Sequence, residues 1–173
     1  MKHSGHAPVR HPDWRFLLRH PAHFIALGFG GGLARKAPGT WGTLLGLPCY
    51  ALLLHWLTPV QIALLCVPAF ALGVWAAGIA GRALGVHDHG SIVIDEIVAI
   101  WLVLAAVPAT WAGFAAAFVV FRFFDIVKPW PIRVLDARVP GGIGVMIDDL
   151  LAAVYSIAVL RLALHVWPGL LGV

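Results

Sequence analysis

The chain has 173 residues, of which 61% are hydrophobic and only 12% are charged. Soluble domains carry about 25% charged residues, so this composition excludes an ordinary water-soluble globule and predicts a protein that faces lipid. The formal net charge is +4. The sequence lacks a basic helix and a basic stretch interleaved with aromatic residues, so we expect no nucleic-acid partner.

Residues 1–23 are polar, contain five of the nine histidines and are predicted to form an N-terminal tail. Residues 24–33 are apolar and rich in glycine, but a spanning helix needs about 20 residues. We therefore expect a short interfacial or re-entrant segment there. Each of five further apolar stretches is a candidate transmembrane helix: 40–57, 60–80, 91–107, 109–124 and 143–165.

Several of these stretches are short for a span, so the sequence predicts an all-α integral membrane protein with a bundle of about four to five transmembrane helices. Residues 24–173 would form one membrane-embedded domain. The Thr58-Pro59 pair and Pro108 should break helices. Polar connections are predicted at 81–90 and, as a long loop, at 125–142.

The basic residues are distributed unevenly over the predicted loops. With the N-terminus inside, eleven of the twelve Lys and Arg residues fall on the cytoplasmic side and only Arg161 on the other. Cytoplasmic loops of membrane proteins carry such an excess. The pattern predicts a multi-pass protein with its N-terminus in the cytoplasm.

Acidic residues gather at the same predicted membrane face. Asp95 and Glu96 lie near the start of one span, Asp125 at the end of another, and Asp148 and Asp149 near the start of the last. Charges in hydrocarbon are costly, so such groups usually face a bundle interior and have partners. Carboxylate oxygens alone suit Mg²⁺ or Mn²⁺ rather than zinc. We predict that all five are ligands of Mg²⁺; helix capping or pairing with nearby arginines is the alternative.

Two segments could bind an anion at this face. Lys128 and Arg133 lie in a loop stiffened by two prolines, and Lys36 and Thr40 follow the glycine-rich run. Cations and backbone N–H groups near glycine are typical of phosphate sites. We predict that these four residues bind a phosphate group. Non-specific binding of anionic lipid, and glycine that serves only packing, stay open as alternatives.

Three sequence blocks together resemble the phosphatidylglycerophosphatase A family. They are APGTWGT at 37–43, SIVIDEIV at 91–98, and FRFFDIVKPWPIR at 121–133, which is followed by MIDD at 146–149. The resemblance covers most of the chain, from about residue 24 to residue 167. It implies a Mg²⁺-dependent enzyme of the bacterial cytoplasmic (inner) membrane that hydrolyses phosphatidylglycerophosphate to phosphatidylglycerol and phosphate.

Under this hypothesis the active site faces the cytoplasm, at the depth of the lipid headgroups. Catalytic roles are assigned to Asp95, Glu96, Asp125 and Asp149, one of them as general base. Direct attack by water is favoured, and an aspartyl-phosphate intermediate stays open. The main alternative function is a transporter or ion-coupled protein that uses intramembrane carboxylates, although such sites usually lie at the membrane midplane.

Overall fold

The computed structural model describes residues 11–86 and 88–172. Within these ranges the chain is helical and contains no strand, which confirms the predicted all-α class. The elements in chain order are α1 (Trp14–Arg19), α2 (Pro21–Ala26), the 3₁₀ helix η1 (Gly28–Leu33), α3 (Pro38–Leu53), α4 (Pro59–Leu84), α5 (Ile94–Ala105), α6 (Trp111–Val127), α7 (Ile132–Arg138) and α8 (Gly141–Val166).

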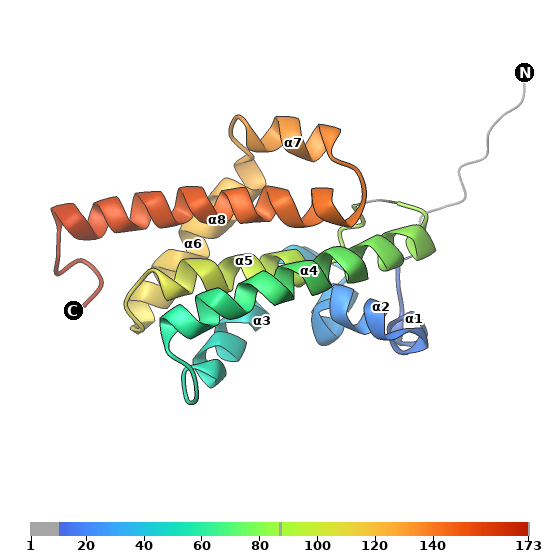
Figure 1. The fold of residues 1–173 in the computed structure, drawn as a ribbon, viewed down its shortest axis with the longest axis horizontal. Helices are drawn as coiled ribbons and strands as arrows, with labels where there is room; N and C mark the ends of the chain where they lie inside the picture. Colours follow the sequence, from blue (N-terminus) through green and yellow to red (C-terminus); the bar gives the residue numbers. More distant parts are fainter. Residues whose placement is uncertain (1–10, 87, 173) are drawn as a thin grey trace, which may run out of the picture.

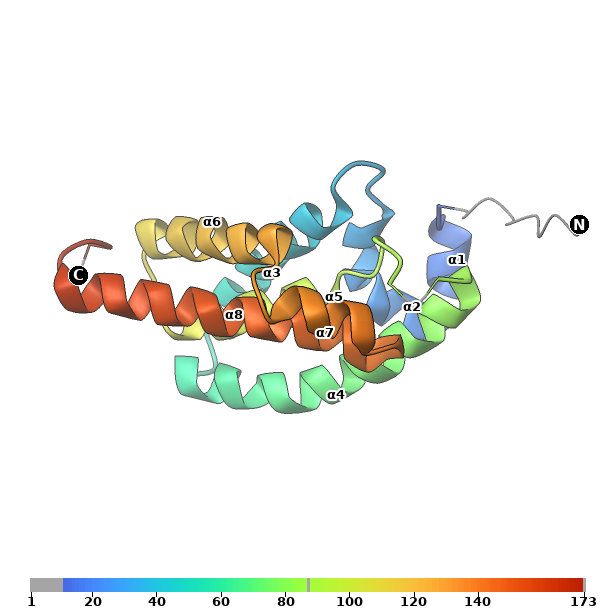
Figure 2. The same ribbon diagram turned by 90° about the horizontal axis from the view of Figure 1, so that it is seen from above.

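The long helices run roughly along the long axis of the molecule, which is horizontal in Figures 1 and 2, and α5 lies in the middle. α5 packs against α3, α4, α6 and α8, and every residue from Ile94 to Ile100 is buried. A helix that is apolar all round needs such complete cover. The short helix α7 lies along α8, and α2 packs beside α4.

Two helices are long and apolar enough to cross a membrane. α4 and α8 have 26 residues each, with mean hydropathies of 2.2 and 2.0 in their most apolar windows. They suggest that the protein associates with a membrane. α3, α5 and α6 have 16, 12 and 17 residues, below the length of about 20 that a span requires. The predicted count of four to five spans therefore stays a prediction.

The chain reverses at the two breaks that the prolines predict. Thr58 caps α4 with a capping box: its side chain accepts from the N–H of Gln61, and the Gln61 side chain accepts from the N–H of Thr58. Thr110 caps α6 by accepting from the N–H of Gly113. Both turns lie at one end of the bundle, so α5 and α8 begin at the other end, where α4 and α6 finish.

The glycine-rich run packs closely against the start of α5. The N–H of Val93 donates to the carbonyl of Ala26 over 2.8 Å. A Cβ at Gly28 would overlap Val93 and Ile97, and one at Gly32 would overlap the carbonyl oxygen of Ser91. The glycines thus serve close packing that holds the first turn of α5.

Part of the segment predicted as a polar tail is folded. Residues 1–10 lie outside the described part, but α1 and α2 cover most of residues 13–26. Leu17 and His23 are buried, and the His23 ring stacks on Phe16 with centroids 4.0 Å apart. The segment thus packs on the bundle although it is polar in sequence, and one of its histidines is buried there.

The long loop predicted at 125–142 is wrong in its central part. α6 continues to Val127, and residues 132–138 form α7. The reason is burial: Ile132 is fully buried in the main core cluster, beside residues of α8. Prolines suggested an irregular segment, but proline is well tolerated at a helix start, and Pro131 stands immediately before α7.

The packing of Gly32 can be tested by Gly32→Ala. Its added Cβ would overlap the Ser91 carbonyl, so we expect a loss of about 1–3 kcal/mol in unfolding free energy, seen as a lower Tm in detergent. Gly90→Ala is the matched control, because a Cβ there meets no atom within 4 Å. Equal Tm values for the two variants would show that this contact is not needed.

Candidate active site

Three carboxylates from two helices share one buried space. Asp95 and Glu96 lie in the first turn of α5, and Asp149 lies in the N-terminal part of α8. Each offers an oxygen, and these oxygens lie within 4.8 Å of one another. All three residues are buried, with at most 9% of their surface exposed. The N-terminal end of α5 favours negative charge there.

One oxygen of each residue in this trio lacks a partner. Among the described residues, Asp95 Oδ1, Glu96 Oε2 and Asp149 Oδ2 are buried and accept no hydrogen bond. Buried charge without compensation is strongly unfavourable. A divalent cation would supply that compensation, and an all-oxygen set of acidic ligands suits Mg²⁺ or Mn²⁺. The trio therefore fits the predicted Mg²⁺ chemistry.

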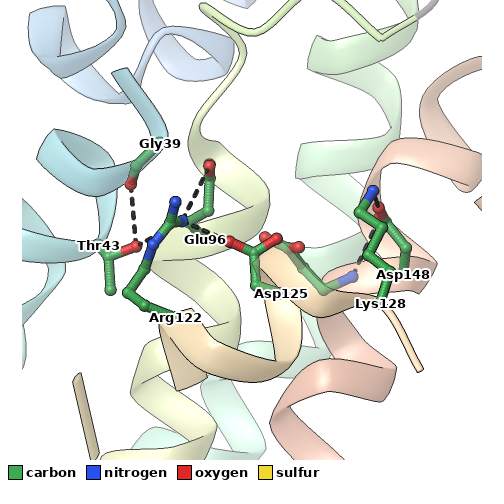
Figure 3. Close-up of polar contacts among 8 residues, drawn as sticks. Gly39, Thr43, Glu96, Arg122, Asp125, Lys128 and Asp148 are labelled. Carbon is green, nitrogen blue, oxygen red and sulfur yellow. Dashed lines mark hydrogen bonds and ion pairs between the residues drawn. The ribbon is translucent and has the colours of Figure 1, made fainter. Parts of the chain in front are cut away.

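Asp125, a fourth predicted ligand, is paired with Arg122. Nη1 of Arg122 lies 2.5 Å from Oδ2 of Asp125 and 3.7 Å from Oε1 of Glu96. Nη1 also donates to Oγ1 of Thr43 over 3.4 Å, and that hydroxyl donates to the carbonyl of Gly39. Figure 3 shows the Arg122 side chain between Thr43 and Asp125, with Glu96 beside it.

Asp148, the fifth predicted ligand, is paired with Lys128. Nζ of Lys128 lies 2.5 Å from Oδ2 of Asp148 (Figure 3). The same Nζ lies 3.1 Å from Oδ2 of Asp136. The other oxygen of Asp148 accepts from the N–H of Asp149. The structure thus divides the five carboxylates into two groups. Asp95, Glu96 and Asp149 each have an oxygen without a partner, whereas Asp125 and Asp148 each form an ion pair with a basic side chain.

The charge of Lys128 is well supported. Burial alone would lower its pKa, but hydrogen bonds to Asp148 and then Asp136, with the attraction of both carboxylates, raise the pKa above its ordinary value. Lys128 therefore carries a positive charge throughout the neutral range. It occupies the C-cap of α6, where a cation also interacts favourably with the helix dipole.

The four predicted phosphate-binding residues differ in exposure and in their contacts. Lys36 and Arg133 are exposed, and within the described ranges neither forms an ion pair. Thr40 is half-buried in the first turn of α3. Of these four residues, Lys128 alone forms an ion pair with a site carboxylate among the described residues. The phosphate roles of all four stay predictions.

Thr43 and Asp136 were not among the site residues that the sequence predicts, and Arg122 entered only through the alternative in which the acids pair with nearby arginines. Arg122 and Thr43 complete the network around Glu96 and Asp125, and Asp136 provides the second acceptor of Lys128. Arg122 carried a local signal, because residues three apart face each other on a helix and Asp125 follows at that spacing. Thr43 gave no such signal, because Arg122 is 79 residues away in sequence. Asp136 meets Lys128 only because residues 132–138 form α7, which the sequence did not predict.

The cation site predicts a response to Mg²⁺ that needs no substrate. Mg²⁺ should raise the Tm of the wild-type protein in detergent, because a ligand of the folded state stabilises it by about 2.7 kcal/mol at a hundred times its Kd. Asp149→Asn should lose this increment. In EDTA the same variant should be at least as stable as wild type, because it removes one of three crowded carboxylates.

Asp13→Asn is the control for that experiment. Asp13 caps α1 and is distant in sequence from the three carboxylates, and Asn caps a helix equally well. Its Mg²⁺ response should match wild type. A full Mg²⁺ response in Asp149→Asn would contradict the cation site.

The chain is similar to known proteins over most of its length. Residues 24–164 match the family model described as Phosphatidylglycerophosphatase A. The protein of that name from Haemophilus influenzae is 45% identical over 157 residues, which cover 90% of this chain and 96% of the relative. The one from Escherichia coli is 42% identical over 164 residues, covering 92% and 94%.

A relative from Bacteroides thetaiotaomicron is 41% identical over 152 residues, covering 80% of this chain and 91% of the relative. Its name assigns it provisionally as a phosphatidylinositol-3-phosphatase. No solved structure matches the chain significantly. With a family model matched over residues 24–164 and two relatives of that name above 40% identity, the chain belongs to the phosphatidylglycerophosphatase A family.

Proposed function

We propose that this protein is a Mg²⁺-dependent phosphatase that hydrolyses phosphatidylglycerophosphate to phosphatidylglycerol and inorganic phosphate, as a step of phosphatidylglycerol biosynthesis. One observation carries the proposal: a chain of this family places three buried carboxylates, each with an oxygen without a hydrogen-bond partner, in one space. Names of the Haemophilus and Escherichia relatives support the substrate.

The proposed site is set in the cytoplasmic membrane of a bacterium, in a multi-pass chain with its N-terminus and active site on the cytoplasmic side. Eleven of the twelve Lys and Arg residues on one predicted side support this orientation. The trio lies at the end of the bundle where α5 and α8 begin and α6 finishes. A lipid phosphate at headgroup level could reach that end while its acyl chains stay in the bilayer.

In the proposed mechanism Asp95, Glu96 and Asp149 hold the cation. The chemistry that a bound Mg²⁺ supplies is electrostatic, because its charge stabilises the oxygens of the phosphoryl group. Asp125 lies beside the trio, and Arg122 contacts its Oδ2. Its other oxygen, Oδ1, accepts the proton of the attacking water. The water oxygen forms the new bond to phosphorus while the bond from phosphorus to the glycerol oxygen breaks. The glycerol oxygen then takes up the proton held by Asp125, which gives the alcohol of phosphatidylglycerol and inorganic phosphate.

Positive side chains assist by binding the substrate phosphate. Lys128 is charged and next to the site, so it offsets negative charge on the phosphoryl group. The exposed Lys36 and Arg133, with Thr40, recruit the anionic headgroup from the membrane surface. These three residues act on substrate capture, whereas the trio acts on the reaction.

The proposal predicts phosphate release from phosphatidylglycerophosphate by the purified protein in detergent micelles with Mg²⁺, and none with EDTA. Asp95→Asn should lower the rate about 100-fold, because it removes charge from the cation site. Unchanged release in EDTA, or full activity of Asp95→Asn, would contradict the mechanism. Phosphatidylinositol 3-phosphate belongs in the same assay because the Bacteroides relative is named for it. Faster release from that lipid would change the assigned substrate.

The role of Lys36 predicts a different kinetic signature. Lys36→Gln should raise the apparent KM for phosphatidylglycerophosphate in mixed micelles about fivefold and leave kcat near wild type. The reason is that an exposed cation near the surface contributes about 1 kcal/mol to lipid attraction. Kinetics at varied surface concentration of the lipid, with Arg15→Gln on α1 as control, would measure this. A lower kcat at unchanged KM would place Lys36 in the chemical step instead.

A further inference from the structure

Arg122 joins three helices at the buried carboxylates. It lies on α6 and contacts Glu96 on α5 and Thr43 on α3, as well as Asp125 one turn along its own helix. Only 15% of its side-chain surface is exposed, and 11% and 12% of those of Glu96 and Asp125. All three contacts are made by Nη1, while the buried Nε has no hydrogen-bond partner among the described residues. The position of Nη1 is therefore set by three partners on three helices.

The contacts divide the two oxygens of Glu96. Oε1 lies 3.7 Å from Nη1 of Arg122, while Oε2 is buried without a hydrogen-bond partner among the described residues. Glu96 belongs to the trio, so an oxygen of it lies near Asp95 and Asp149. The guanidinium thus attracts one oxygen of Glu96, while the other has no protein partner among the described residues.

α3 closes over this pair. A Cβ at Gly39 would overlap Oε1 of Glu96 and lie 3.3 Å from Nη1 of Arg122, so the first turn of α3 approaches as closely as a glycine permits. One turn later the buried Thr43 fixes its own hydroxyl by donating to the Gly39 carbonyl over 2.9 Å. Because the hydroxyl proton is donated to Gly39, the hydroxyl oxygen can act toward Arg122 only as an acceptor, and it accepts from Nη1 (Figure 3).

We infer that Arg122 is a positioning residue that orients Glu96 and Asp125 around the cation, and that Thr43 holds Arg122 in that orientation. The inference rests on the proposed function for the identity of the cation. Arg122 acts through the carboxylates, since its Nη1 is engaged by their oxygens and by Thr43. Outer partners of this kind set how strongly a metal site binds its ion.

The test compares two hydroxyl deletions with the same local chemistry. Thr43→Val removes the acceptor of Arg122 and keeps the shape of the side chain. Ser156→Ala on α8 is the control, because the Ser156 hydroxyl is also buried and also donates to the carbonyl four residues before it, that of Ala152, over 2.7 Å. Both variants lose one buried intrahelical hydrogen bond, but only the first releases Arg122.

Binding of Mn²⁺ to the detergent-solubilised protein, followed by electron paramagnetic resonance without substrate, is the primary measurement. We expect Thr43→Val to weaken Mn²⁺ binding about tenfold, with Ser156→Ala like wild type and Thr43→Ser restored. In the phosphatase assay, Thr43→Val should raise the Mg²⁺ concentration for half-maximal rate by the same factor.

Arg122→Lys is a second test, because it keeps the charge but loses the guanidinium that places Nη1 among Glu96, Asp125 and Thr43. We expect it to weaken Mn²⁺ binding more than Thr43→Val does. Wild-type binding in both Thr43→Val and Arg122→Lys would overturn the inference, and so would equal losses in Thr43→Val and Ser156→Ala.

The outcomes also separate this inference from the proposed function. A wild-type protein that binds Mn²⁺ but releases no phosphate from phosphatidylglycerophosphate would end the proposed function, and the inference would still be judged on Mn²⁺ binding. A wild-type protein that binds no Mn²⁺ would overturn the inference together with the cation site.

Discussion

Burying Asp95, Glu96 and Asp149 within one small space is unfavourable unless something balances their charge, and the surrounding structure is arranged around this constraint. The three side chains lie inside an apolar bundle, where charges interact strongly and lose their hydration. The first turn of α5 contributes its dipole to two of them. The remaining imbalance explains why we assign a divalent cation to the trio, since its charge and its preference for oxygen ligands match what the side chains lack.

Two cations on the chain cover the neighbouring carboxylates. Arg122 pairs with Asp125 and Lys128 pairs with Asp148, so each flanking acid is matched by a base at 2.5 Å. This distribution leaves the uncompensated charge in the middle of the site. It also gives the two basic residues different surroundings: Arg122 is enclosed between helices, whereas Lys128 lies at the end of α6 and faces the substrate in the proposed mechanism.

Close packing of the N-terminal region supplies the rigidity that such a site needs. Glycines of η1 and of α3 allow the backbone to approach Val93, Ser91 and Glu96 within distances that a side chain would prevent. The start of α5 is therefore held by protein contacts on every side, consistent with its twelve residues being too few to cross a bilayer alone. A buried, short central helix can present two acids at one end of the bundle without exposing them on its outer surface.

The sequence by itself determined the all-α class, the breaks at Thr58-Pro59 and Pro108, and the five acidic residues of the site, because hydrophobic composition, proline and intramembrane charge are local signals. It did not predict α7, where burial of Ile132 outweighed the local signal of two prolines. It also did not predict that residues 13–26 fold into two short helices against the bundle.

Within the site, the sequence placed five carboxylates at one face but could not divide them. Only the tertiary structure decided that Asp95, Glu96 and Asp149 converge while Arg122 and Lys128 take Asp125 and Asp148. Thr43 also contacts Arg122 only because of how α3 packs against α6, since the two residues are 79 positions apart in sequence. Helix periodicity fixes which residues share a face, whereas pairing between helices depends on how their axes pack and rotate, and that information is not local.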